Sequence, residues 1–247
     1  MELRALALDF SGNREWPEGR EIMHMDLRRL PGTDGYCSEE ASCVLREKIF
    51  RWGYQGIHFL DSGNYHYLTK FFLEQIEEPF QLVVFDHHTD MQPSALLPLL
   101  SCGNWLLETL MENRNLRRVL LIGPPEEAAS QIPAGFEGRL ALVSAEKLSA
   151  CGNVEEALAA ERWDAALYLS IDKDVLCRED ARTNWDQGEM RLPELCRFLR
   201  VLGERAEILG IDICGAEIPN TAEAEAINSR TDRRLMECID KIPNLRR

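Results

Sequence analysis

Metal-ligand side chains directly follow a short apolar run in the segment LVVFDHHTD, residues 82–90. Asp86, His88 and Asp90 stand at alternate positions, so an extended backbone gives their side chains one direction while the residues between them face away. Carboxylates crowded beside imidazoles repel one another unless cations or protons intervene. The segment therefore predicts a metal site, although polar clusters at strand ends also serve as helix caps or hydrogen-bonded turns.

A second cluster of the same kind ends the apolar run in AALYLSIDKDVL. Asp172 and Asp174 are again two residues apart, with Lys173 facing elsewhere. If both runs are strands of one sheet, four carboxylates meet at one rim, and burying them without compensation is too costly. Two divalent cations would neutralise them, with Mn²⁺ foremost and Fe, Co, Ni or Zn as alternatives. The expected metal ligands are His66, Asp86, His88, Asp90, Asp172 and Asp174.

The elements that position these clusters form an alternation of apolar runs and amphipathic stretches, which predicts an α/β fold with a parallel sheet covered on both faces. In such sheets ligands bind beyond the carboxyl ends of the strands, where both clusters lie. We expect strands at Leu3–Leu8, Ile57–Leu60, Leu82–Phe85, Val119–Ile122, Leu140–Val143, Ala166–Ile171 and Ile208–Ile213. We expect helices at Glu39–Trp52, Tyr67–Ile76, Trp105–Asn113, Val154–Arg162 and Leu192–Arg205, and a helix start at Thr221–Ala226.

Length and composition set limits on partners and location. The chain of 247 residues is long enough for one α/β domain over residues 1–247. Its formal charge of −14 argues against nucleic acid or an anionic membrane as partner, which leaves a small-molecule substrate. The eight cysteines are scattered without a CxxC pair and are expected to be reduced thiols. No leader-like or membrane-spanning run is present, so we expect a cytoplasmic location.

Three motifs carry a family resemblance. FDHHTD is similar to the DAHxD motif, SIDKD to the start of SxDxDxxDP, and SGNYH to the Gly-Gly-Asp/Asn-His segment of the arginase, agmatinase and formimidoylglutamase superfamily, the ureohydrolases. Motif order and spacing agree from Asp61 to Pro219. The resemblance implies a three-layer α/β/α domain with two Mn²⁺ per chain, in which Asp86 and Asp172 bridge the ions. It also implies a homo-oligomer, a trimer or hexamer.

The activity implied by this resemblance is hydrolysis of a linear C–N bond in a guanidino, amidino or formimino small molecule, with a metal-bridging hydroxide as nucleophile. Asp90 and Glu217 are the catalytic residues expected on this basis, and Glu217 resembles the guanidinium-binding glutamate of arginases. A polar loop at the metal side of the sheet adds substrate contacts, or is an ordinary exposed loop. The expected substrate-binding residues are Asn104, Asn184, Asp186 and Glu217, with Trp185 and Gln187 beside them.

Two departures from the family pattern keep other functions open. Cys177 and Arg178 replace the Asp-Pro ending of the second motif, and Trp105 and Leu106 follow the SCGN segment where arginases have a proton-shuttle histidine. One alternative is a deacetylase-like amidohydrolase, whose relatives share the architecture but use one zinc. The other is a degenerate member that binds metal without catalysis. Outside the motifs, His58 lies inside an apolar strand and is expected to be a hydrogen-bonded core histidine.

Overall fold

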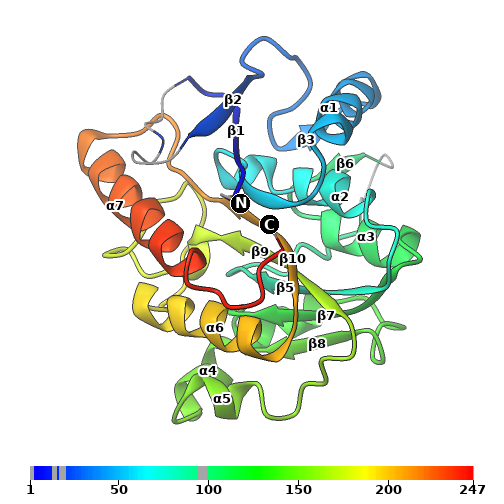
Figure 1. Cartoon of the computed structure of the whole chain (residues 1–247), viewed down its shortest axis with the longest axis vertical. Helices are drawn as coiled ribbons and strands as arrows, with labels where there is room; N and C mark the ends of the chain where they lie inside the picture. Colours follow the sequence, from blue (N-terminus) through cyan, green and yellow to red (C-terminus); the bar gives the residue numbers. More distant parts are fainter. Residues whose placement is uncertain (1–2, 13–15, 17–20, 94–98, 247) are drawn as a thin grey trace.

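A parallel eight-stranded sheet is the centre of the computed structural model, which describes residues 3–12, 16, 21–93 and 99–246 (Figure 1). The strand order is β2-β1-β4-β10-β9-β5-β7-β8, and each neighbouring pair is parallel. The strands are β1 (Ala5–Asp9), β2 (Ile22–Asp26), β4 (Gly56–Phe59), β5 (Phe80–Phe85), β7 (Leu116–Ile122), β8 (Leu140–Val143), β9 (Ala166–Asp172) and β10 (Ile208–Cys214).

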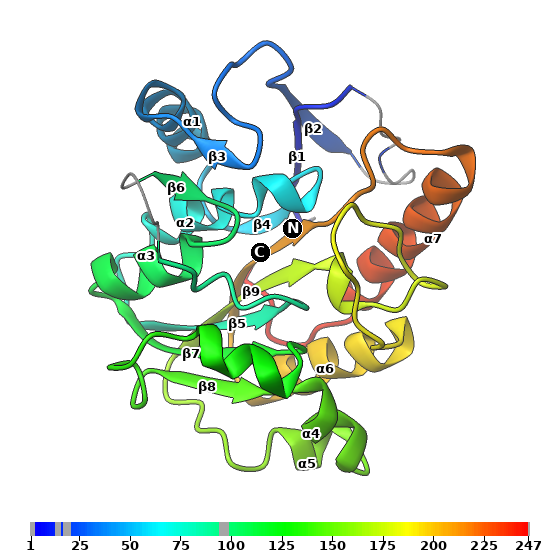
Figure 2. The same ribbon diagram turned by 180° about the vertical axis from the view of Figure 1, so that it is seen from behind.

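Helices cover both faces of this sheet, which confirms the α/β/α fold (Figures 1 and 2). One face carries α1 (Glu39–Trp52), α2 (Leu68–Leu73) and α3 (Trp105–Glu112), and the other carries α6 (Leu192–Arg205) and α7 (Ala222–Ile239). The remaining elements are the short antiparallel pair β3 (Tyr36–Cys37) and β6 (Leu100–Ser101), helices α4 (Ala145–Ala150) and α5 (Val154–Ala157), and the 3₁₀ turns η1 (Gly63–Tyr65), η2 (Glu126–Gln131) and η3 (Lys173–Val175).

The apolar runs of the sequence are continuous because each central strand is buried on both faces. In β5, Leu82 and Val84 pack with the α1–α3 layer, whereas Val83 and Phe85 pack with the α6–α7 layer. The next residue on the α1–α3 side of this strand is Asp86, at the carboxyl end of the sheet. The alternation of side chains thus selects the face on which the ligand cluster begins.

Every strand expected from the sequence is present, and α1 and α6 have the expected bounds. Strand β2, which pairs with β1 at the sheet edge, was not expected, because its residues IMHMD are largely exposed and give no apolar run. The helix expected at Val154–Arg162 is limited to α5. No helix in the described ranges is both long and apolar enough to cross a membrane.

Two of the eight cysteines are paired. Cys196 in α6 and Cys238 in α7 form a disulfide that joins the two helices of one face. The expectation of reduced thiols is therefore wrong for this pair. It failed because the two residues are 42 positions apart, and only helix packing brings their Cα atoms to 5.8 Å.

Candidate metal centre

Two matching turns at neighbouring strand ends form the base of the centre. Oδ1 of Asp86 accepts the His88 N–H at 2.6 Å, and Oδ1 of Asp172 accepts the Asp174 N–H at 3.0 Å. Each aspartate therefore caps its own turn with one oxygen. The Oδ2 atoms lie 3.1 Å (Asp86) and 3.6 Å (Asp172) from Nδ1 of His66, so each carboxylate both shapes a turn and reaches the centre.

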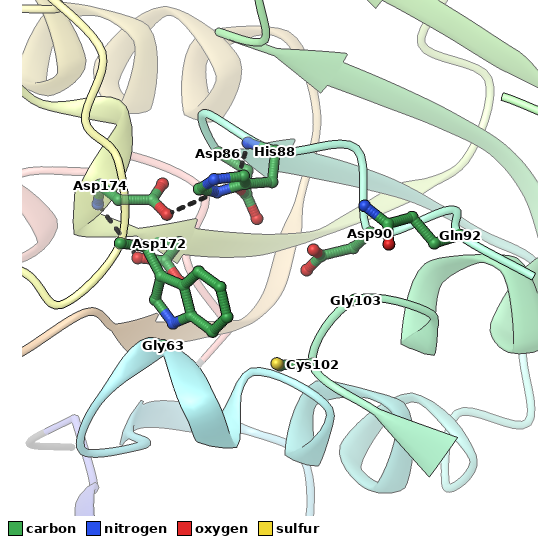
Figure 3. Close-up of a pocket in the computed structure, with 10 residues that line it drawn as sticks. Gly63, Asp86, His88, Asp90, Gln92, Cys102, Gly103, Asp172 and Asp174 are labelled. Atoms are coloured by element: carbon green, nitrogen blue, oxygen red, sulfur yellow. Dashed lines mark hydrogen bonds and ion pairs between the residues drawn. The ribbon is translucent and has the colours of Figure 1, made fainter. Parts of the chain in front are cut away.

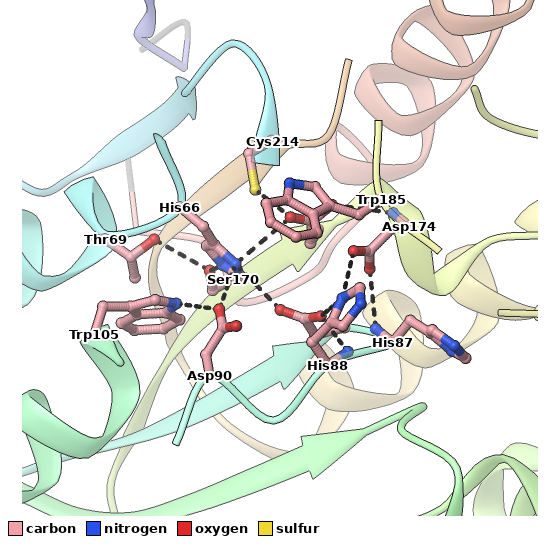
Figure 4. Close-up of polar contacts among 12 residues, drawn as sticks. His66, Thr69, His87, His88, Asp90, Trp105, Ser170, Asp174, Trp185 and Cys214 are labelled. Atoms are coloured by element: carbon pink, nitrogen blue, oxygen red, sulfur yellow. Dashed lines mark hydrogen bonds and ion pairs between the residues drawn. The ribbon is translucent and has the colours of Figure 1, made fainter. Parts of the chain in front are cut away.

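His66 directly follows η1 and is fully buried. A contact on the side of the ring away from the carboxylates fixes its orientation. Its Nε2 lies 2.8 Å from the Ser170 hydroxyl, which in turn lies 3.2 Å from the Thr69 hydroxyl. Ser170 precedes Asp172 by two residues in β9 and shares its face of the sheet. Nδ1 consequently faces the carboxylates, with Oδ2 of Asp90 at 3.1 Å (Figure 4).

Asp90 is placed by the start of α3. Its φ of 50° lies in the left-handed region, which aspartate tolerates better than most residues. The Leu106 N–H donates to its carbonyl at 3.2 Å, and the Trp105 indole N–H donates to its Oδ2 at 2.5 Å. Trp105, which the sequence indicated only as a departure from the arginase pattern, therefore acts as a support for an expected ligand.

The sixth expected ligand, His88, lies on the open side of the centre. Its Nδ1 lies 2.9 Å from Oδ2 of Asp174 and 3.5 Å from Oδ1 of Asp86, and its side chain is 36% exposed. Five of the six expected ligands converge in two groups that share Asp86, and the sixth, Asp172, lies beside His66. One group is His66, Asp86 and Asp90, and the other is Asp86, His88 and Asp174.

Burial and mutual repulsion distribute charge unevenly over these carboxyls. Burial, reinforced by the charge of Asp86, raises the pKa of Asp90 to about 7, and burial with the charge of Asp172 raises the pKa of Asp174 well above its usual range. For Asp86 burial acts in the same direction, but the neighbouring imidazoles of His66 and His88 outweigh it and lower the pKa. Without cations the centre therefore retains protons that a bound ion would displace.

The donor set fits divalent cations. His66 Nδ1 is buried and makes no hydrogen bond, although carboxylate oxygens of Asp86 and Asp90 lie 3.1 Å from it. Separations of this size are those of adjacent ligand atoms around an ion with bonds of about 2.1 Å. Carboxylate oxygens and imidazole nitrogens suit Mn²⁺ and its neighbours in the first transition row.

A cavity of about 120 Å³ opens onto the centre (Figure 3). The Trp185 indole, 43% exposed, lies edge-on to the His88 ring at 5.9 Å and donates its N–H to Asn64 at 2.9 Å. Trp185 therefore forms a fixed apolar wall at the mouth. The described lining residues are Gly63, Asp86, His88, Asp90, Gln92, Cys102, Gly103, Asp172, Asp174 and Trp185.

Trp185 lies in this lining as expected, whereas the other expected substrate residues do not: Asn104, Asn184, Asp186, Gln187 and Glu217. Asn104 is buried and uses its amide on the Ser101 N–H and the Leu99 carbonyl. Asn184 uses its amide on both backbone groups of Ile218. Asp186 is exposed, and Glu217 is half-buried on the loop after β10. The two asparagines therefore hydrogen-bond loop backbone and do not line the cavity.

Three further residues, His58, His87 and Leu106, do not belong to the described cavity lining. His58 is a hydrogen-bonded core histidine, as expected, with Nδ1 2.8 Å from Asp212 and 3.1 Å from the Tyr168 hydroxyl. Burial, together with the charge of His88, lowers the pKa of His87, whose backbone N–H donates to Asp174. Leu106, at the position considered for a shuttle histidine, is buried in the core.

The stability of the metal-free chain is expected to fall as pH rises from about 5 to about 8, because folding raises two pKa values. Asp90 is raised from 3.8 to about 7 by burial and then by the charge of Asp86. For His88, burial opposes protonation, but hydrogen bonds that the protonated ring donates to Asp174 and Asp86 raise the pKa from 6.5 to about 11. In both windows the folded state binds more protons than the unfolded state, so deprotonation destabilises it.

Thermal unfolding in chelator across this range, repeated with saturating Mn²⁺, measures the effect. Bound cations replace the protons, so Mn²⁺ should raise the melting temperature most at the alkaline end. Asp90→Asn should flatten the acidic half of the metal-free profile. A metal-free profile that rises with pH over this range would contradict the assignment.

Comparisons with known proteins show a shared fold, but sequence identity to the solved structures is low. No protein-family profile matches the chain. A protein of Thermotoga maritima, described as uncharacterized, is 33% identical over 177 residues, which are 70% of this chain. The match spans 65% of that relative's length, so it covers less than two thirds of it.

Solved structures with ureohydrolase names share the fold at low identity. Proclavaminate amidino hydrolase from Streptomyces clavuligerus matches with a TM-score of 0.66 and 13% identity over 96% of this chain and 90% of that one. Arginase from Bacillus cereus gives 0.64 and 17% over 90% and 85%. A triple mutant of an arginase-like protein from T. brucei, bound with Mn²⁺, gives 0.57 and 17% over 97% and 80%.

Proposed function

Since the chain has the fold of the arginase and agmatinase superfamily, we propose that it is a metal-dependent hydrolase of linear C–N bonds in a guanidino, amidino or formimino small molecule. The observation that carries the proposal is the convergence of His66, His88 and four aspartates at the carboxyl rim of the sheet. Two divalent cations are the proposed cofactors, with Mn²⁺ foremost and Fe, Co, Ni or Zn as alternatives. When bound, they supply Lewis acidity and lower the pKa of a coordinated water toward neutrality.

The size and lining of the cavity fit a substrate with a small, planar, cationic head group. Its volume of about 120 Å³ is well below that of a drug-sized site, so only the reacting end of a substrate fits inside. The Trp185 indole offers an aromatic face to a guanidinium or amidinium group, and its link to Asn64 fixes the orientation of that face. The net charge of −14 attracts cations toward the protein.

We assign proton transfer to the Asp90 carboxylate. Its Oδ2 is held by the Trp105 N–H, and its side chain lines the cavity. An aspartate carboxylate that lines the cavity can take a proton from the attacking water and pass it to the departing amine nitrogen. The half-buried Glu217 lies outside the described lining, so we give it no contact with the reacting carbon.

A screen for urea and ammonia release tests the proposal. The chain, loaded with Mn²⁺, is offered agmatine, guanidino acids and formimino compounds, and we expect metal-dependent turnover of one of these classes. Asp164→Asn, at an exposed residue before β9, is the matched control and should keep the rate. Turnover of acetylated amines alone, or bound metal without any turnover, would contradict the proposed reaction.

A further inference from the structure

Cys214 lies at the centre although it belongs to none of the three motifs. It is the last residue of β10, is fully buried, and pairs in register with Asp172 of β9. Neighbouring residues in a parallel pair project to the same face, so its side chain enters the centre beside that carboxylate. Its Sγ lies 3.1 Å from Oδ2 of Asp172.

A second observation indicates a ligand at this point. His66 is 1% exposed, its Nδ1 makes no hydrogen bond, and Ser170 holds Nε2 so that Nδ1 faces inward. The ligand atoms of His66, Asp172 and Cys214 lie within 4.8 Å of one another. An orphaned imidazole nitrogen, a carboxylate and a thiol in one buried group are the donors of a mixed nitrogen, oxygen and sulfur site.

The two halves of the centre differ in consequence. The His66 half is buried and has a thiol within ligand distance, whereas the His88 half combines Asp86, Asp174 and a 36% exposed imidazole without sulfur. Thiolate ligands favour Zn²⁺, Co²⁺ and Fe²⁺, and carboxylate oxygens favour Mn²⁺. The two halves therefore differ in the chemistry of their donor atoms, although they share Asp86.

Resting on the metal centre of the proposed function, we propose that the Cys214 thiolate is a ligand of the His66 half and makes it selective for Zn²⁺, Co²⁺ or Fe²⁺ over Mn²⁺. On coordination the sulfur–hydrogen bond breaks, the proton leaves to solvent, and the sulfur electron pair forms the bond to the ion, with no change of oxidation state. The His88 half keeps an oxygen and nitrogen donor set.

Cobalt substitution tests this ligand without an activity assay. Co²⁺ added to metal-free protein should produce an intense sulfur-to-cobalt charge-transfer band, which Cys214→Ser abolishes. Cys37→Ser, at a buried thiol away from the centre, and Cys102→Ser, at a thiol of the cavity lining, should leave the band in place. A band that persists in Cys214→Ser, or is lost in Cys102→Ser alone, overturns the proposal.

Competition with a chromophoric chelator measures selectivity. Cys214→Ser should weaken Zn²⁺ binding on the order of 100-fold and change Mn²⁺ binding by less than about 3-fold. Equal losses for both ions would overturn the selectivity.

X-ray absorption of the wild-type protein with bound Zn²⁺ provides a test that needs no variant. We expect one sulfur at about 2.3 Å in addition to nitrogen and oxygen neighbours. A shell of nitrogen and oxygen alone overturns the inference, even if guanidino compounds are hydrolysed. Sulfur coordination without any such hydrolysis would instead contradict the proposed reaction and leave this inference standing.

Discussion

Asp86→Asn is expected to abolish tight binding of both divalent ions and to lower any hydrolysis by about 10³-fold or more. The reason is that Asp86 is the residue shared by the His66 and His88 groups, with Oδ2 3.1 Å from one imidazole and Oδ1 3.5 Å from the other. Asparagine keeps the shape and the Oδ1 acceptor for the His88 N–H but removes the negative charge. Loss of one charge therefore affects both halves of the centre at once.

Metal content after dialysis and calorimetric titration with Mn²⁺ measure this effect, and circular dichroism with thermal unfolding checks that the fold is retained. Asp164→Asn, an aspartate-to-asparagine change at an exposed site outside the centre, should bind ions as the wild type does. Asp90→Asn should impair the His66 group more than the His88 group, since Asp90 belongs to the first alone. A folded Asp86→Asn protein that binds two ions with wild-type affinity would show that these groups are not the ligands.

The positions of the strands were predictable because burial on both faces imposes apolar residues at every position. The runs in β5 and β9 are visible without any tertiary information, and both end at aspartates. Strand β2 obeys a different constraint. It lies at the sheet edge with His24 and Met23 exposed, so its residues carry little pattern to detect.

The ligand cluster was predicted for a reason that is only partly correct. Strand β5 ends at Phe85, so Asp86, His88 and Asp90 do not share a direction by strand alternation. The turn capped by Asp86 directs His88, and the left-handed backbone of Asp90 returns the chain to the centre. The prediction from the Asp-x-His spacing still holds, because a short capped turn and an extended strand both bring alternate residues near each other.

The sequence could not show which side chains are used for hydrogen bonds to the backbone. Asn184 and Asn104 have the composition of substrate contacts, but each satisfies backbone groups that would otherwise lose hydrogen bonds. Cys214 is the reverse case. Its position two residues after Asp212 in β10 carries the alternation signal, yet only the register with Asp172 shows that it meets the other ligands.

A buried ion pair joins helix α7 to the turn between Asp172 and Asp174. Lys173 lies between Asp172 and Asp174 and points to the opposite face, as its place in the sequence indicated, with Nζ 2.9 Å from Asp232 of α7. Both side chains are fully buried. Removing one partner of such a pair deprives the other charge of a compensation that water cannot replace. The pair also ties α7 to η3, the turn that presents Asp174.

Asp232→Ala should therefore lower the free energy of unfolding by about 3–5 kcal/mol, whereas Lys173→Met combined with Asp232→Leu should recover most of the loss by removing both charges together. Glu237→Ala on the same helix breaks an exposed pair with Arg234 and should cost about 1 kcal/mol or less. Denaturant unfolding of the metal-free proteins measures all three. Because the recovered double variant still lacks the tie between α7 and η3, it should bind the ion at Asp174 more weakly than the wild type. Equal destabilisation by Asp232→Ala and Glu237→Ala would mean that the buried pair neither supports the fold nor holds the ligand turn in place.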